Sequence, residues 1–196
     1  MNLTEMRTRV REDLQDTDSQ NYRWTDDEVD GAIDRVVLEY SLHAPIQQQT
    51  DIATTDGDTE IDISTLTGIL EVESVEFPIG QVPKYYQRIV YWAGNLDMED
   101  AGSGADARVR WLKKHTLTTE TTTIPPEHEE IIVLGATGYL VMSASAATVD
   151  RAFIAGHYGS TSYRGWGRER LARYDQKLKA ISRSSRLSQK ELYTQD

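Results

Sequence analysis

The sequence contains no cysteine in its 196 residues. Disulfide bonds, thiolate metal sites and cysteine nucleophiles are therefore excluded. No hydrophobic run is long enough to cross a bilayer, because the longest apolar-leaning stretch, residues 131–142, is short and contains Gly135 and Gly138. Residues 1–7 turn charged at once and carry no apolar signal region. We therefore expect a soluble protein that is made in the cytoplasm and has no membrane partner.

What the chain does have is an ordinary globular composition with an uneven distribution of charge. Hydrophobic residues make up 38% and charged residues 27%, which argues against disorder, and the length allows one core or one core with an insertion. Residues 1–150 hold 28 acidic and 11 basic side chains, whereas residues 151–196 hold 4 acidic and 10 basic ones. This split predicts two surfaces of opposite sign that meet different partners or neighbouring copies of the chain. The alternative is an acidic body with a basic helix folded back onto it.

The first 44 residues predict two helices. Apolar residues spaced by three and four positions share one face of the first helix: Leu3, Met6, Val10 and Leu14. After a polar break over residues 16–21, Thr25 and Glu28 have the spacing of a capping box, in which each side chain bonds the other residue's backbone N–H. The second helix then continues to Pro45, which ends it. Its apolar positions are Val29, Ile33, Val36, Val37 and Tyr40.

Residues 45–123 have the pattern of short strands. The turn Asp56-Gly57-Asp58 precedes alternating apolar positions at Ile61, Ile63, Ile69, Val72, Val75 and Phe77. Residues 86–92 and 107–112 form a further alternating pair around the loop 98–104, and six threonines among residues 116–123 favour extended chain. We predict a small antiparallel sheet inserted between helices.

Two more helices are predicted after Pro125 and Pro126, because proline is tolerated in the first helical turn. Residues 131–147 are apolar nearly all round, and Gly135 and Gly138 allow a close approach of another backbone, so this helix belongs in the middle of a bundle. The last helix, from near Tyr163, carries an apolar seam with arginines and lysines on its flanks. The seam consists of Leu171, Tyr174, Leu178 and Ile181.

These patterns predict an α+β fold that is mainly α. Residues 1–44 and 124–181 would form a helical bundle, residues 45–123 a small antiparallel β-rich insertion, and residues 182–196 a C-terminal arm that follows the long last helix. The arm is polar and is expected to become ordered only when it binds a partner.

No metal site or cofactor is predicted. His128-Glu129 resembles the start of a zinc-protease helix, but the required second histidine would stand at position 132, which is Ile132. Asp16, Asp18 and Asp27 fall at positions one, three and twelve of an EF-hand loop that lacks the bidentate glutamate. We interpret these residues as helix-end and turn residues instead.

No catalytic or nucleotide site is predicted either. The loop 102–107 loosely matches a dinucleotide fingerprint, but a strand, and not a helix, is expected to follow it. The four histidines are scattered, and no serine lies in a nucleophile elbow. We therefore expect a protein that is not an enzyme.

The basic last helix is the main candidate for an interaction site. Its basic face consists of Arg164, Arg168, Arg170, Arg173, Lys177 and Lys179. These residues, with Arg183 and Arg186, fit phosphate groups as well as an acidic protein surface, but no helix-turn-helix or RNA-binding signature accompanies them. Because the acidic remainder would repel DNA, docking onto an acidic protein is favoured over a DNA-binding module.

Three segments together resemble the head–tail adaptor (connector) proteins of tailed phages. The first is residues 3–33, with the motif Trp24-Thr25-Asp26-Asp27-Glu28-Val29-Asp30-Gly31-Ala32-Ile33. The second, residues 124–140, is similar to the central helix of that family, and the third, residues 168–174, to its last helix. The β-rich insertion has no counterpart in the resemblance.

The resemblance implies a structural virion protein at the head–tail junction, forming a ring of about twelve subunits beneath the portal that continues the DNA channel toward the tail. It also implies that the C-terminal segment docks on the portal. The expected docking residues are Arg183, Arg186, Leu187, Lys190, Leu192 and Tyr193. Partners would be other copies of the chain, the portal, a tail or neck protein, and passing DNA without sequence-specific binding. A neck, tail-completion or tail-terminator ring protein is the alternative within virions.

Overall fold

The computed structural model describes residues 1–99, 102–155 and 159–190, and the side chains of 1–99, 102–144 and 163–182. These residues form two compact units. The helical unit comprises residues 1–44 and 115–196, and the β-unit comprises residues 45–114. Each unit has its own cluster of buried hydrophobic side chains, so each is described by itself. None of the described helices is both long and apolar enough to cross a membrane.

The helical unit begins with the predicted pair of helices, α1 (Leu3–Leu14) and α2 (Asp26–His43). Capping boxes begin both, Asn2 with Glu5 for α1 and Thr25 with Glu28 for α2. The capping box predicted at Thr25 is thus confirmed. The predicted apolar stripe of α2 is buried, and on α1 Met6 and Val10 are fully buried while Leu3 and Leu14 pack against the same core.

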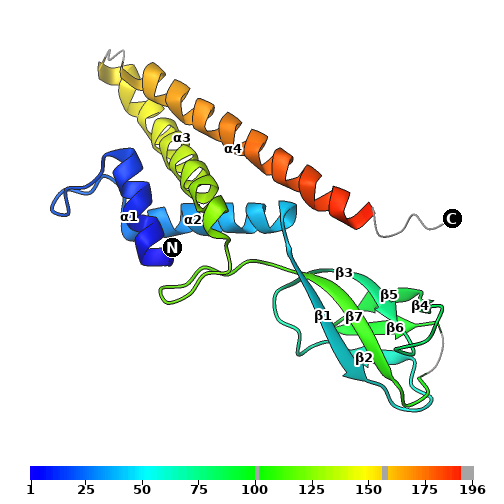
Figure 1. The fold of residues 1–196 in the computed structure, drawn as a ribbon. Helices are drawn as coiled ribbons and strands as arrows, with labels where there is room; N and C mark the ends of the chain where they lie inside the picture. The colour runs from blue at the N-terminus through cyan, green and yellow to red at the C-terminus, as the bar shows by residue number, and fades with distance from the viewer. Residues whose placement is uncertain (100–101, 156–158, 191–196) are drawn as a thin grey trace. The chain divides into compact units, whose positions relative to one another are not determined.

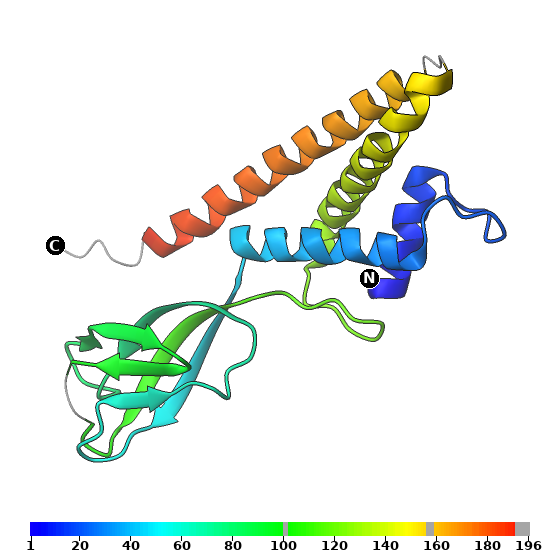
Figure 2. The ribbon, with the colours of Figure 1, turned by 180° about the vertical axis from the view of Figure 1, so that it is seen from behind.

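A short 3-10 turn, η1 (Pro126–His128), leads into α3 (Glu129–Ala155), and α4 (Gly159–Lys190) follows. In Figures 1 and 2, α3 and α4 lie beside each other and run in opposite directions. The predicted glycines permit this approach: a Cβ at Gly138 would lie 2.8 Å from Leu171 Cδ2, and one at Gly135 would lie 2.9 Å from Tyr174 Cε2. Within the seam of α4, Tyr174 and Leu178 are buried, and Leu171 and Ile181 pack against the same core.

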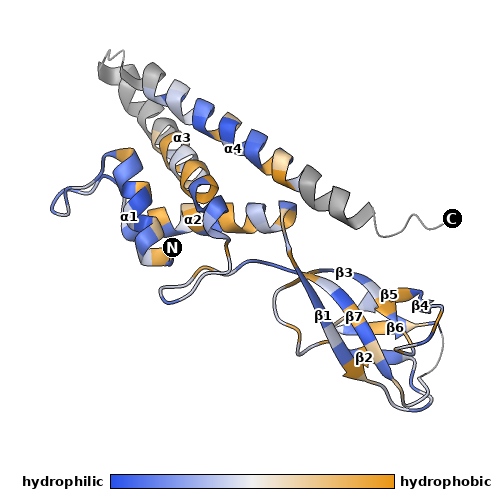
Figure 3. Ribbon diagram, viewed as in Figure 1, coloured by the Kyte–Doolittle hydropathy of each residue, from blue (hydrophilic) through white to orange (hydrophobic). Residues whose placement is uncertain are grey.

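The prediction of a mainly α fold built on a helical bundle is wrong. α2 runs across α3, and α1 runs across α2, so the four described helices share no common axis (Figures 1 and 2). The hydrophobic stretch of α3, orange in Figure 3, accepts neighbours on several sides. Sequence periodicity indicates which face of a helix is buried, but the crossing angle depends on how side-chain ridges fit into grooves. α4 also begins at Gly159 instead of near Tyr163 and continues to Lys190, beyond the predicted start of the arm.

The β-unit contains seven described strands in two antiparallel sheets, which is more than the one small sheet predicted. One sheet has the order β1 (Ile46–Ala53), β7 (Asp106–Lys113), β3 (Ile69–Glu76) and β4 (Tyr86–Gln87). The other has the order β2 (Glu60–Asp62), β6 (Asn95–Met98) and β5 (Ile89–Trp92). The buried residues of both sheets form one core: Ile61, Ile63, Val75, Phe77, Leu96, Met98, Ala107, Val109 and Trp111.

The two strands predicted to pair around the loop 98–104 do not pair with each other. β7 lies between β1 and β3, while β5 pairs with β6 through the two-residue turn Ala93-Gly94. Both turn residues have positive φ, 48° and 91°, as a type I′ hairpin turn requires. Alternation marked these segments as strands but did not identify their partners.

Candidate interaction surfaces

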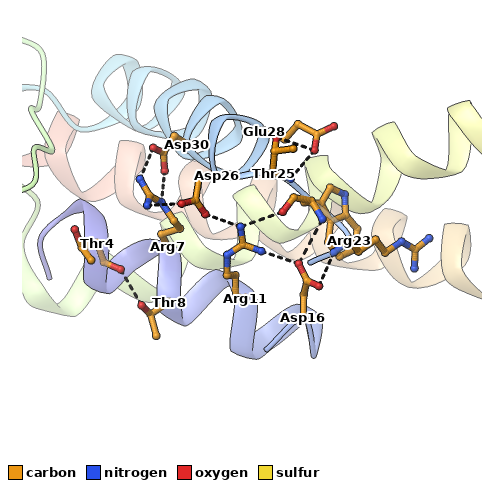
Figure 4. Close-up of polar contacts among 11 residues, drawn as sticks. Thr4, Arg7, Thr8, Arg11, Asp16, Arg23, Thr25, Asp26, Glu28 and Asp30 are labelled. Atoms are coloured by element: carbon orange, nitrogen blue, oxygen red, sulfur yellow. Dashed lines mark hydrogen bonds and ion pairs between the residues drawn. The ribbon is translucent and has the colours of Figure 1, made fainter. Parts of the chain in front are cut away.

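A buried arginine fastens the start of α2 to α1. Arg11 is 4% exposed, and its guanidinium donates to Asp16 Oδ2 at 2.7 Å, Asp26 Oδ1 at 2.7 Å and the Trp24 carbonyl at 3.0 Å. Figure 4 shows it between the two carboxylates. Because charge-assisted hydrogen bonds satisfy the guanidinium on several sides, it can be buried without an isolated charge. The segment between the helices is therefore held at both ends.

Asp16 and Arg7 complete this network. Asp16 accepts from the backbone N–H of Arg23 at 2.8 Å, and Arg7 forms a two-point pair with Asp30 at 2.6 and 2.8 Å (Figure 4). The hydrogen bond from Arg11 lowers the pKa of the Asp26 carboxyl, and the hydrogen bond to Asp30 raises the pKa of Arg7. The N-terminal residues that carry the family resemblance thus serve the fold, and the Asp16 predicted as a turn residue proves to be a buried ion-pair partner.

Three of the six residues of the predicted basic face on α4 pair with carboxylates. Arg170 reaches Asp13 on α1 at 2.7 Å, while Arg173 and Lys179 bond Glu169 and Asp175 of α4 itself, each at 2.5 Å. The Arg170–Asp13 pair lines a pocket of about 450 Å³ that also contains Arg9, Glu12, Glu129 and Glu130. Because this pocket mixes both signs of charge, it does not select an anion or a cation.

Arg164, Arg168 and Lys177 are exposed, and none of them forms an ion pair with another side chain that the structure describes. Arg164 and Arg168 are four residues apart, so they stand one turn apart on the same flank of α4. Lys177 lies toward the opposite flank, with the buried seam between them. The structure thus divides the predicted basic face into paired residues and residues available to a partner.

The residues predicted for portal docking lie outside the described side chains. Arg183, Arg186, Leu187 and Lys190 belong to α4 by backbone, and Leu192 and Tyr193 follow its end. Their role stays a prediction.

A cluster centred on Glu39 connects three helices and was not predicted. Glu39 of α2 accepts from the hydroxyl of Tyr139 at 2.8 Å, from that of Tyr174 at 3.2 Å and from Arg35 Nε at 3.1 Å. Burial, followed by the charge of Glu39, raises the pKa of Tyr174, and burial raises that of Tyr139. These residues are far apart in the sequence, so no local spacing reveals the cluster.

Three buried polar side chains of the helical unit, Ser41, His115 and Thr137, have hydrogen-bond partners within it. Ser41 donates to the Val37 carbonyl at 2.6 Å and accepts from the His115 backbone N–H at 2.9 Å. The His115 ring lies 2.9 Å from each of two carbonyls, those of Ala44 and Thr123, and Thr137 donates to the Val133 carbonyl at 2.7 Å. None of these groups is left to act on a substrate.

The remaining sequence candidates also have structural partners. His128 Nδ1 lies 2.6 Å from the hydroxyl of Tyr40, and the loop that matched a dinucleotide fingerprint leads into β7, as predicted, and not into a helix. Asp18 accepts from the Gln20 N–H and the Asn21 amide, which lowers its pKa, as in a turn. Among the described residues, no group of three or more His, Cys, Asp or Glu is placed to hold a metal ion.

No family model matches the chain, and no curated protein matches it. A chain from the solved structure "Virion of native gene transfer agent (GTA) particle" matches over 71% of this chain and 77% of its own length, with 13% identity and a TM-score of 0.30. A likeness at that TM-score does not establish a shared fold.

Proposed function

We propose that this protein is a structural component of a virion, without enzymatic activity, and acts as a head–tail adaptor. In this role its copies form a ring, of about twelve subunits in the family it resembles, beneath the portal. The ring joins the portal to the tail or a neck protein and continues the DNA channel. The sequence resemblance in three segments supplies the role, and the unpaired arginines Arg164 and Arg168 on α4 support it.

The free cations of α4 carry the assembly part of the proposal. In the helical unit, Arg7, Arg11 and Arg170 pair with carboxylates on other elements or on the segment between α1 and α2, while Arg164 and Arg168 have no described acidic partner. Residues 1–150 carry 28 acidic and 11 basic side chains, so a neighbouring copy offers the missing negative charge. A contact between the basic face of one copy and the acidic face of the next is heterologous, and contacts of this type form rings when the rotation between copies closes.

The same two arginines also favour the rival function, a DNA-binding module. Neutralising phosphates releases counterions, so duplex binding through Arg164 and Arg168 would weaken steeply with salt. An adaptor that lets DNA pass instead needs acidic residues toward the channel and no tight duplex binding. The two functions therefore differ in a measurable salt dependence.

Electron microscopy of the full chain mixed with its cognate portal tests the proposal. We expect closed rings stacked on the portal for the wild type, and loss of ring closure for Arg164→Glu/Arg168→Glu, because like charges would then meet at the contact. Arg173→Gln is the matched control: it removes an exposed arginine that is already paired within α4, and rings should persist.

Three outcomes would contradict the proposed adaptor role. A monomer that ignores the portal would contradict the adaptor role. Duplex binding that falls steeply with salt and is abolished by Arg164→Glu/Arg168→Glu, without ring formation, would establish the DNA-binding alternative. Rings that form without the portal and bind only tail proteins would favour a neck or tail-terminator role.

A further inference from the structure

The β5 edge differs from the other three sheet edges of the described β-unit. β1 presents the exposed glutamines Gln47, Gln48 and Gln49, β2 is three residues long and includes Glu60 and Asp62, and β4 has two residues. β5, by contrast, reads Ile89-Val90-Tyr91-Trp92, with no charge or proline. Natural sheets blunt their edges with charges, prolines or short strands, because an open apolar edge recruits another strand. β5 lacks these protections except for its modest length.

The backbone of β5 is available on its outer side. The two-residue turn makes Trp92 and Asn95 the closing hydrogen-bonded pair, so Tyr91 and Leu96 form a non-hydrogen-bonded pair. The Met98 N–H bonds the Thr59 carbonyl at 2.7 Å on the β2 side, which agrees with this alternation. The N–H and C=O groups of Ile89 and Tyr91 therefore point away from β6, and no described residue bonds them.

The side chains of this edge are exposed although they are apolar. The exposed fractions are 60% for Val90, 59% for Tyr91 and 74% for Trp92. Tyr91 stands opposite Leu96 on the core face, whereas Val90 and Trp92 stand opposite Asp97 and Asn95 on the solvent face. Adjacent exposed aromatic and aliphatic groups of this kind mark interaction sites.

Acidic side chains continue the solvent face beyond Val90 and Trp92. The register places Asp97 beside Val90, Glu60 beside Asp97, and Asp62 beside Asn95. Glu60 accepts from the Asn95 amide and Asp62 from the Ser64 N–H, while none of the three forms an ion pair with a described cation. Arg88, which precedes β5 outside the paired register and alternates with Val90 and Trp92, adds one positive charge beside three carboxylates, so the face is negative on balance.

From these observations we propose that β5 is a docking edge for an extended segment of another protein, with alternating basic and apolar side chains. The segment would pair with the free backbone groups of Ile89 and Tyr91, as in β-strand addition. Its apolar side chains would pack on Tyr91, and its lysines or arginines would lie over Val90 and Trp92 and reach the carboxylate of Asp97. This inference is independent of the adaptor role.

The test uses the full chain and a ten-residue peptide of alternating lysine and valine as the probe. Amide hydrogen exchange measured by NMR should slow at least about tenfold at Ile89 and Tyr91, and much less at Val90 and Trp92, which already bond β6. A peptide of the same composition with its lysines and valines in separate blocks, and an alternating glutamate–valine peptide, should protect neither site.

Variants of Tyr91 and of the acidic residues separate the contribution of backbone hydrogen bonds to binding from that of the charges. Tyr91→Pro removes the outward N–H and leaves the bonds to β6 in place, so peptide binding should weaken at least about tenfold. If the proline variant does not fold, Tyr91→Lys replaces it, because a charged residue on an edge strand also opposes strand addition. Glu60→Gln/Asp97→Asn should weaken binding of the lysine–valine peptide and make that binding less dependent on salt. Val82→Ser is the matched control, because Val82 is 97% exposed in the same unit but outside the strand.

Three results would overturn the proposal. Unchanged exchange at Ile89 and Tyr91 would show that no strand adds to this edge. Equal protection by the glutamate–valine peptide would contradict the basic chemistry of the partner. Protection that rises with protein concentration in the absence of peptide would identify a second copy of the chain as the occupant.

Discussion

In the helical unit, charged side chains of different elements face one another, whereas in the β-unit the apolar side chains of one edge face solvent. Arg11 and Asp16 are both under 10% exposed and satisfy each other. Val90 and Trp92 are more than half exposed and have no described cover. The first arrangement gives the connection between two helices a single geometry, and the second leaves a surface that a partner can use. The buried ion pair thus serves the stability of the fold, whereas the exposed strand edge, like the unpaired arginines of α4, is available to a partner.

The largest expected effect comes from breaking the buried ion pair. Arg11→Met leaves the carboxylate of Asp16 buried without its cation, and such a loss costs about 3–5 kcal/mol of unfolding free energy. Urea denaturation followed by circular dichroism measures it. Arg9→Met is the matched control on α1, because Arg9 is 64% exposed in a pair with Glu12, and pairs of this kind contribute about 1 kcal/mol at most.

The double variant Arg11→Met/Asp16→Asn sharpens the same comparison. It removes the buried charge as well as its partner, so it should recover part of the stability lost in Arg11→Met. An equal loss in Arg11→Met and Arg9→Met would show that the network contributes no more than a surface pair does.

The local features of the fold could be predicted from the sequence, whereas the contacts between distant elements could not. The capping box at Thr25, the buried stripe of α2 and the seam of α4 follow from local spacing, and the structure confirms them. The Arg11 network was missed, because its members come from the end of one helix, a loop and the start of the next. The bundle prediction failed because period does not fix crossing angles, and the β5–β6 hairpin was missed because Ala93-Gly94 is a weak turn signal.

For the basic face of α4, the sequence likewise predicted the charged residues but not their tertiary partners. Composition and helical spacing placed Arg164, Arg168, Arg170 and Lys177 on one helix, but they gave no indication that Arg170 meets Asp13 of α1. Which cation remains free depends on the tertiary neighbour. Sequence alone therefore identified the charged surface but not its available part.

A moderate effect is expected where α3, α2 and α4 meet. A Cβ at Gly135 would lie 2.9 Å from both Tyr174 Cε2 and Val36 Cγ2, so Gly135→Ala forces side chains in the core to move. Overpacking of this kind costs about 1–3 kcal/mol, less the gain in helix propensity of up to about 1 kcal/mol. Thermal unfolding monitored by circular dichroism measures the difference.

Gly31→Ala in α2 is the matched control, because a Cβ there meets nothing within 4 Å. It should be neutral or stabilise the protein by up to about 1 kcal/mol. If Gly135→Ala were as stable as Gly31→Ala, the close approach of α4 to α3 would not depend on this glycine.

The smallest expected effect separates the buried tyrosines of the helical unit from the exposed ones of the β-unit. Burial raises the pKa of Tyr40 from 10.0 to about 12. The folded state therefore holds this proton more tightly than the unfolded state, so the stabilisation is complete below pH 10 and is lost as the pH rises toward about 12. Tyr40→Phe should cost about 1 kcal/mol at neutral pH through the lost hydrogen bond to His128, and should lessen the alkaline decline.

Urea denaturation at neutral pH and above pH 10 measures both parts. Tyr85→Phe is the control, because it removes a hydroxyl from a side chain that is 58% exposed. It should leave the neutral stability and the alkaline decline as in the wild type. Since burial also raises the pKa of Tyr139 and Tyr174, part of the decline should remain in Tyr40→Phe. An unchanged decline in Tyr40→Phe would exclude Tyr40 as a contributor and point to the other tyrosines whose pKa burial raises, Tyr139, Tyr163 and Tyr174.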